Sequence, residues 1–372
     1  MLFQIAGIVK SQTEADSSAP FSYTFEYVGD VFTNLHGGLK TGSTFLGMAN
    51  LTLAFDTEKA GFWKGGMFFI NAANTHGGRP SDILVGDFQG VSNIEAGDLS
   101  YLHEVWFKQT FNKLSFIIGL QDLNAEFAAC DLGGMFINSS FGIHSTIADN
   151  VPSPIFPLTR LGAIFEWKPN ENIEFMTGVF DGLLSDYQNN EYNMNWDLKT
   201  GEGMLYVGEI VFSGKFINSK HGNYKLGFYN HNHKVAADDE GSYTVENNLG
   251  LYVLLDQLVY KNKNNDGGIG IFAQLGLSNP DLNNHYAYLG FGMQYCGFSS
   301  NRCDDEIGLA LAQTWLKKST NGNETVIELS YKAILGDHFF IQPDFQYIIN
   351  PAGTDEKLIN SFIGNLRFGI NF

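Results

Sequence analysis

The 372-residue sequence contains no run of about 20 apolar residues, the length that a membrane-spanning helix needs. Its longest uncharged stretches are interrupted by glycine, asparagine, serine or glutamine at nearly every second position. Charged residues are also scarce, at 17% of the chain, which is low for the surface of a soluble protein of this length. The first absence argues against a bundle of membrane helices, and the second argues against an ordinary soluble domain.

Basic residues are few, with 22 Lys and Arg against 40 Asp and Glu and a formal net charge of −18. Binding to nucleic acid depends on Lys and Arg, so the sequence argues against a nucleic-acid partner. A pore for anions should carry a ladder of basic residues, and the sequence contains none. The G-x-S-x-G motif of serine hydrolases is absent too, so we expect no enzyme activity, no cofactor and no metal.

The chain has only three cysteines, at positions 130, 296 and 303, and they form no zinc-binding pattern. Cys296 and Cys303 flank the turn-like hexapeptide Gly297–Arg302. A disulfide between them could close a hairpin in an oxidising compartment, and two reduced thiols are the alternative. The sequence leaves both readings open, and Cys130 is left over in either case.

Aromatic residues are abundant, at 14% of the chain including 32 Phe, and they recur with a period of two. The last residues show this best. Phe362, Gly364, Leu366, Phe368, Ile370 and Phe372 alternate with Ser361, Asn365, Arg367 and Asn371. Such alternation predicts a β-strand with one apolar and one polar face. Pro343 interrupts a similar run, and since proline removes a donor from the ladder, we expect a bulge there.

Runs of this kind predict sixteen strands. They are 21–33, 44–56, 63–73, 98–110, 113–121, 159–168, 172–181, 203–217, 221–231, 247–259, 268–277, 285–297, 304–316, 323–335, 338–349 and 360–372. Apolar faces rich in Phe and polar faces rich in Gly fit strands that contact lipid outside and water inside. A soluble sandwich or propeller would instead need polar outer faces and few glycines in its core. We therefore predict an all-β fold, a sixteen-stranded antiparallel transmembrane barrel of the outer membrane.

The predicted connections alternate between short turns and long loops, the asymmetry typical of periplasmic turns and external loops. Residues 122–158 form the longest loop and are rich in apolar side chains. We expect this loop to fold into the barrel and narrow it, because a barrel of this size is too wide for side chains to fill. An external cap packed on other loops is the alternative. We expect residues 1–20 to form a periplasmic extension and residues 21–372 to form the barrel.

Several motifs resemble the carbohydrate-selective porin family of the OprB type over about residues 40 to 372. Tyr101–Gln109 resembles its Y-x-x-E-x-W-x-x-Q strand, and Gly119–Phe127 its G-x-x-D-x-N-x-x-F segment. Phe136–Gly142 matches its F-x-N-S-S-F-G segment. Gln342–Pro351 resembles its closing Q-P-D-x-Q-Y-I-x-N-P motif, and Gly353 and Arg367 follow as in the family. The resemblance implies a sixteen-stranded barrel for passive, selective diffusion of monosaccharides such as glucose.

Candidate sugar-binding residues are those expected to face the lumen or to begin the inward loop, since sugars are held by polar groups and aromatic faces. They are Glu104, Trp106, Lys108, Asp122, Asn124, Phe127, Arg160, Glu166, Asp344, Gln346 and Arg367. For Glu104 and Arg160 the alternative is a salt bridge within the wall, and for Trp106 it is packing. Asp122, Asn124 and Phe127 either contact sugar or anchor the loop.

The expected partners are small neutral sugars inside the barrel and lipid or lipopolysaccharide outside it. Whether copies of the chain associate is left open. A general or cation-preferring porin is the first alternative function, because acidic residues are in excess. A plugged barrel with a structural or adhesive role is the second.

Overall fold

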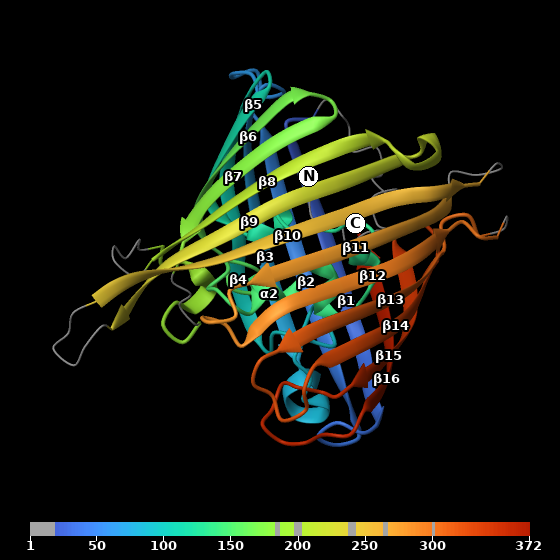
Figure 1. Ribbon diagram of the computed structural model, residues 1–372. Coiled ribbons are helices and arrows are strands. Elements are labelled where there is room, and N and C mark those ends of the chain that lie inside the picture. Colours follow the sequence, from blue (N-terminus) through green and yellow to red (C-terminus); the bar gives the residue numbers. More distant parts are fainter. Residues whose placement is uncertain (1–18, 183–186, 197–202, 237–242, 263–266, 300–301) are drawn as a thin grey trace.

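A computed structural model describes residues 19–182, 187–196, 203–236, 243–262, 267–299 and 302–372. Within them, sixteen antiparallel strands close into one barrel, each strand paired with its neighbours in the sequence and β16 paired with β1 (Figure 1). The strands are β1 (Phe21–His36), β2 (Gly42–Asp56), β3 (Gly66–Gly77), β4 (Leu99–Phe111), β5 (Leu114–Gln121), β6 (Arg160–Asn170), β7 (Ile173–Asp181), β8 (Met204–Lys215), β9 (His221–Ala236), β10 (Tyr243–Lys261), β11 (Gly268–Ser278), β12 (His285–Cys296), β13 (Glu306–Leu316), β14 (Glu324–Ile334), β15 (Phe339–Ile349) and β16 (Ser361–Asn371). The predicted fold is confirmed.

The alternation read from the sequence becomes an apolar outside and a polar inside. On β14, Leu329 is 46% exposed on the outer face, whereas its neighbour Glu328 is fully buried inside. On β15, Phe345 is likewise 47% exposed on the outer face, and its neighbour Asp344 is buried inside. Apolar side chains on the outer surface are stable only against lipid, so the pattern fixes which face of each strand meets the membrane.

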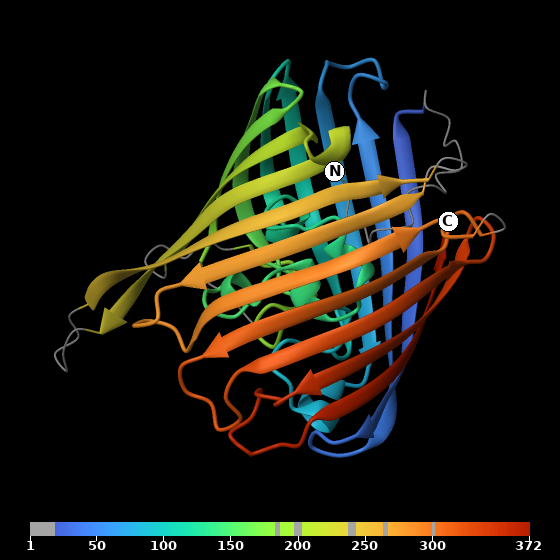
Figure 2. The same cartoon turned by 45° about the vertical axis from the view of Figure 1, so that its right-hand side comes forward.

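The first and last strands pair antiparallel, with Asp30 opposite Arg367. Both ends of the barrel domain therefore lie at one end of the cylinder, as the even strand count requires (Figure 2). The short turns, such as residues 112–113 and 171–172, lie at that same end. The longest connections lie at the other end. Residues 1–18, most of the predicted periplasmic extension, lie outside the described residues.

The bulge predicted at Pro343 is wrong. Pro343 pairs with Leu366 of β16 in an unbroken register. On its other side the β14–β15 bridges stop at Ser330 opposite Asp344 and resume, in the same register, at Ala333 opposite Ile341. The proline thus removes local pairing, since its ring nitrogen cannot donate, without adding a residue to the strand.

A bulge does occur between β3 and β4. Asn71 pairs with Glu104, but Ala72 pairs with Leu102, so His103 is an extra residue on β4. A bulge lets two neighbouring side chains share one face. Both His103 and Glu104 are consequently buried on the lumen side, which strict alternation does not predict.

Among the described residues, two long connections fold deep into the barrel. Loop L2 (residues 78–98) contains one short helical turn, η1 (Ser81–Val85), and loop L3 (residues 122–159) contains the larger set. The turns of L3 are η2 (Leu123–Ala125), η3 (Gly133–Met135), α1 (Ser139–Gly142) and α2 (Ser145–Ala148), and Figure 1 shows them within the cylinder. The predicted inward course of L3 is confirmed. The inward course of L2 was not predicted.

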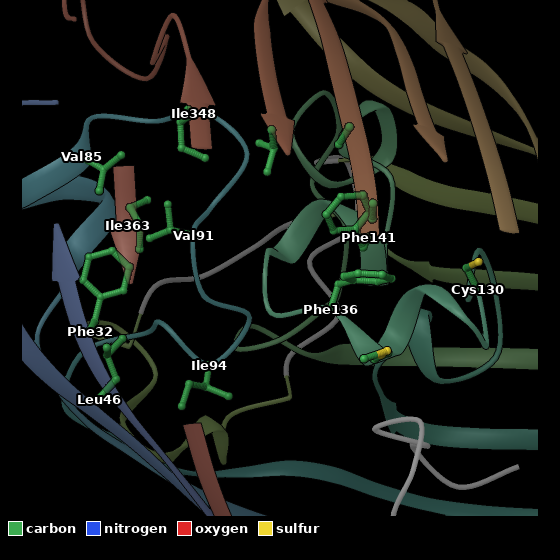
Figure 3. Packing of buried hydrophobic residues seen from close by; sticks show 14 of the residues in the cluster. Phe32, Leu46, Val85, Val91, Ile94, Cys130, Phe136, Phe141, Ile348 and Ile363 are labelled. Carbon is green, nitrogen blue, oxygen red and sulfur yellow. The ribbon is translucent and has the colours of Figure 1, made fainter. Parts of the chain in front are cut away.

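Apolar side chains of both loops pack on the inner wall. Figure 3 shows this packing, in which Val85, Val91 and Ile94 of L2 join Phe32, Leu46, Ile348 and Ile363 of the strands, and Phe136 and Phe141 represent L3. A second cluster places Leu123, Phe127 and Ile147 of L3 against β5 to β10. A core inside a porin-sized barrel is built by loops, because strands alone leave its centre open.

The remaining short turns are η4 (Glu191–Asn193) and η5 (Ile217–Ser219). Within the described ranges, no helix has the length and apolar character to cross a membrane.

Candidate functional site

Acidic side chains on the inner wall hold the inward loops. Glu324 of β14 accepts hydrogen bonds from the backbone N–H groups of Phe88 (2.8 Å) and Gln89 (3.0 Å) in L2. Four residues further along the same strand, Glu328 accepts from the backbone N–H groups of Ile137 (2.6 Å) and Asn138 (3.0 Å) of L3. Each carboxyl group thus accepts two backbone hydrogen bonds from one loop, and these four bonds fix both loops to β14.

Two further strands hold L3 in the same way. Asp256 of β10 accepts from the backbone N–H groups of Asp131 (3.1 Å) and Leu132 (2.9 Å). Glu209 of β8 accepts from the N–H of Ala128 at 3.0 Å and from the Tyr252 hydroxyl at 2.8 Å. These carboxylates pair with loop backbone groups and are buried. They do not line an open water path.

The candidate residues on β15 and β16 also lie under the loops. Arg367 donates to Asp30 through two parallel bonds of 2.7 and 2.8 Å. Gln346 donates to the carbonyl oxygen of Val91 in L2 (2.9 Å) and to Asp344 at 3.2 Å. The lumen-facing positions of Asp344, Gln346 and Arg367 agree with the sequence, but the fold separates these three from Glu104 and Trp106.

The candidate residues on β4 and β6 lie on another part of the wall. The indole N–H of Trp106 donates to Glu104 Oε1 at 3.3 Å, and the Trp106 ring stacks on Phe69 of β3 with centroids 4.7 Å apart and an interplanar angle of 24°. Lys108 Nζ lies 2.8 Å from a carboxylate oxygen of Glu166. Trp106 and Lys108 are part-exposed, whereas Glu104 and Glu166 on the same strands are buried. Trp106 also packs against the L3 cluster, so this wall is only partly covered.

The residues that begin L3 build the loop itself. Asp122 accepts from the backbone N–H of Asn124 (2.7 Å) and of Phe156 (3.0 Å), and it pairs with His103 at 3.2 Å. Asn124 donates to the carbonyl oxygen of Phe127 at 3.2 Å, and Phe127 is fully buried. Asp122 therefore joins the two ends of L3, with local turn geometry supplied by Asn124.

Arg160 lies at the start of β6 and is 5% exposed. Asp181 and Tyr187 are its electrostatic neighbours. Among the described atoms, its Nη2 has no hydrogen-bond partner. Arg160 is thus not part of the pair formed by Lys108 and Glu166, and it lies nearer to the loop that follows β7.

Two ionisable groups of the inward loops are neutral near pH 7. Burial raises the pKa of Glu95 in L2 to about 8, with the nearby Asp87 adding to the effect. Burial lowers the pKa of His144 in L3 to about 3, and His285 contributes in the same direction. Neither side chain therefore adds a charge to the lumen at neutral pH.

The two cysteines proposed as a disulfide lie close together. Cys296 ends β12, and its Sγ lies 3.9 Å from the carbonyl oxygen of Cys303 in the turn that follows. The disulfide stays a prediction. Cys130 is buried in L3, where its thiol donates to Asp256 at 3.3 Å.

Residues of β2 and β3 that the sequence analysis did not single out lie next to the candidate residues of β4. Asn50 of β2 and Asn71 of β3 have side chains on the lumen face, and Phe69 supports Trp106. The alternation of apolar and polar residues could have indicated Asn50 and Asn71, because each is an isolated amide on a strand with an apolar outer face. His103 carried no such signal, since it faces inward only through the bulge.

Comparison with known proteins bears on this arrangement of strands and loops. The carbohydrate-selective porin family, OprB, matches residues 40–372. Porin B of Pseudomonas aeruginosa is 23% identical over 416 residues, covering 93% of this chain and 86% of that protein. The fold resembles OprB of Pseudomonas putida in its high-pH structure with a TM-score of 0.84 and 20% identity, covering 97% of this chain and 96% of that one. The low-pH structure of the same protein gives a TM-score of 0.64 and 18% identity, covering 98% of this chain and 96% of that one.

The family match spans most of the chain and includes every motif through which the sequence resembles it. The closed sixteen-stranded barrel is the fold of the structural relatives. The protein is therefore an outer-membrane porin that belongs to the carbohydrate-selective porin family, OprB.

Proposed function

We propose that this porin conducts small neutral sugars such as glucose by passive diffusion along the wall formed by β2 to β6. The observation that carries this proposal is the unequal division of the lumen. L2 and L3 are bonded to β8, β10 and β14 through buried carboxylates. Asn50, Trp106 and Lys108 on the other wall keep part of their surface exposed.

The chemistry of this wall suits a polyol. The Trp106 ring offers an apolar face to sugar C–H groups, and the Lys108–Glu166 pair offers both a donor and acceptors to hydroxyl groups. Charges of opposite sign that already pair with each other attract a neutral dipole weakly, so a sugar can enter and leave. We place Glu104, Trp106, Lys108, Arg160 and Glu166 on the conducting side. We assign Asp122, Asn124, Phe127, Asp344, Gln346 and Arg367 to holding the loops.

A general or cation-preferring pore is the competing function, and the net charge of −18 favours it. The role of the lumen carboxylates in holding the loops argues against a cation-preferring pore. Glu209, Asp256, Glu324 and Glu328 accept hydrogen bonds from loop backbone groups, so a passing cation would have to displace the loops to reach them. We therefore expect weak ion selectivity.

Liposome swelling and bilayer recording test the proposal together. We expect glucose to enter proteoliposomes faster than neutral solutes of equal size that lack a pyranose ring, and to reduce the KCl conductance in a saturable way. Uptake that follows molecular size alone would support the general pore. A large reversal potential in a KCl gradient would support cation preference. A reconstituted protein without conductance would exclude both.

Other partners follow from the outer surface. Exposed leucine, isoleucine and phenylalanine side chains, such as Leu251, Leu309 and Phe345, are suited to contact with lipid chains and lipopolysaccharide. We propose a channel without catalysis, in keeping with relatives that are porins. Whether copies of the chain associate in the membrane stays a prediction to be measured.

A further inference from the structure

Two amide side chains on β2 and β3 each have an oxygen atom that lacks a hydrogen-bond partner among the described residues. Asn71 is 7% exposed, and among the described atoms its Oδ1 accepts no hydrogen bond. Asn50 is part-exposed, and its Oδ1 is likewise buried without a partner. A buried polar atom without a hydrogen bond is costly, so a native lumen retains it where water or a ligand hydroxyl supplies the hydrogen.

The strand register brings these amides together. Asn50 lies opposite Ala73, and Asn71 lies opposite Thr52 on the lumen face of the same strand pair. Asn50 and Asn71 are thus diagonal neighbours, about 7 to 8 Å apart at the backbone. That spacing lets both side chains contact a single small ring between them.

An aromatic surface lies next to the amides. Asn71 of β3 pairs with Glu104 of β4. Phe69, which lies two residues before Asn71, pairs with Trp106. The Trp106 ring is supported by Phe69 and held by its bond to Glu104, so its orientation is fixed. An aromatic ring beside planar amides is the combination that binds sugars, because the ring contacts C–H groups while the amides bond hydroxyls.

The amides also differ in charge from the wall beneath the loops. Asn50 and Asn71 offer donors and acceptors without net charge. Two carboxylates are neighbours on the lumen face: Glu26 of β1, which lies opposite Asn50, and Glu104, which accepts from Trp106 and from the backbone N–H of Asp122 at 3.4 Å. A neutral polyol therefore finds unsatisfied hydrogen-bonding groups at this position.

We propose that Asn50 and Asn71, together with the Trp106 ring, form a sugar-binding subsite that recognises neighbouring hydroxyl groups of a neutral pyranose. This inference rests on the proposed function, because it presumes that sugars pass along the β2–β4 wall. The two asparagines determine how tightly a sugar is held at the subsite, while ions pass without contacting them strongly.

Bilayer recordings with glucose test the subsite. The variants are Asn50→Ala, Asn71→Ala and the double substitution, and the probe is the glucose concentration that halves the KCl conductance. Loss of one or two neutral hydrogen bonds should raise this concentration roughly 3- to 10-fold for each single variant and more for the double. The KCl conductance should stay equal or rise slightly, because alanine is smaller.

Asn74→Ala is the matched control. Asn74 lies on β3 three residues from Asn71 but faces outward, where it donates to the carbonyl oxygen of Leu99 (3.0 Å) and to Ser100 Oγ (2.8 Å). Its half-blocking glucose concentration should equal that of the unmodified protein. The Asn71→Ser variant keeps a hydroxyl at the site and should lie between the unmodified protein and Asn71→Ala.

Two results overturn the inference in different ways. If glucose blocks the unmodified channel and the asparagine variants conduct ions with unchanged glucose block, the subsite is wrong and the sugar-conducting function stands. If glucose neither blocks nor permeates the unmodified, conducting channel, the proposed function fails and the subsite fails with it.

Discussion

Replacing Asp256 by asparagine should loosen loop L3 from the wall. Asp256 accepts the backbone N–H groups of Asp131 and Leu132 and the thiol of Cys130. Asparagine keeps one acceptor oxygen and turns an NH₂ group toward the second backbone N–H, so one donor in the loop loses its partner. The shape of the side chain is almost unchanged, which isolates the loss of the acceptor and its charge.

The expected magnitude follows from the bond that is lost. A hydrogen bond to a charged group contributes about 1.5 to 3 kcal/mol. Local opening of L3 around Asp131 and Leu132 should therefore become about 10- to 150-fold more frequent. Hydrogen exchange of these two amides, measured on the protein in detergent, reports this opening directly, because exchange requires the amide to leave its partner.

Asp281→Asn is the control for the same chemical change. Asp281 is exposed outside the lumen, and Lys317 lies 3.7 Å from its carboxylate. Exchange in L3 should be unaffected in this variant. Unchanged protection of Asp131 and Leu132 in the Asp256→Asn protein would refute the argument that lumen carboxylates hold the loop, since no other described side chain accepts from these two N–H groups.

Three further predictions concern the wall at Trp106, loop L2 and the hairpin after β12. Trp106→Ala should weaken glucose block in bilayer recordings about 10-fold or more, because stacking area and the bond to Glu104 are lost together; an unchanged block would remove Trp106 from the pathway. Since burial raises the pKa of Glu95 to about 8, the docking of L2 is strongest when this carboxyl is protonated, and it should weaken as the pH rises from about 5 through about 8. Amide hydrogen exchange in L2, corrected for intrinsic rates, should become faster as the pH rises. This pH dependence should be absent from the Glu95→Gln variant. Intact-mass measurement after alkylation should find Cys296 and Cys303 protected as a disulfide in protein taken from the outer membrane, and two alkylated thiols at these positions would show the reduced alternative.

The strands could be predicted because their signal is local. Each strand must present an apolar face to lipid and a polar face to the lumen, so alternate residues carry the information within the strand itself. The same rule correctly placed Glu104, Glu166 and Arg367 inside. It failed where geometry departs from strict pairing, as at His103, which faces inward through a bulge that depends on the register of β3 against β4.

The roles of the lumen carboxylates could not be predicted in the same way. Glu328 contacts Ile137, which lies 191 residues away in the chain, and Glu324 contacts Phe88 across 236 residues. No periodicity within a strand reports such contacts. The inward course of L2 escaped the sequence for the same reason, because its docking depends on an acceptor supplied by β14.

These contacts give the acidic excess of the chain a structural reason. A sixteen-stranded barrel is too wide for its own side chains to fill, so loops must narrow it, and irregular loops bring backbone N–H groups that have no partner. Carboxylates on the inner wall supply strong acceptors for such groups, as Glu209, Asp256, Glu324 and Glu328 do here. An acidic wall is therefore expected of a barrel narrowed by inward loops, whatever solute it conducts. Net charge alone then says little about the ion preference of the pore.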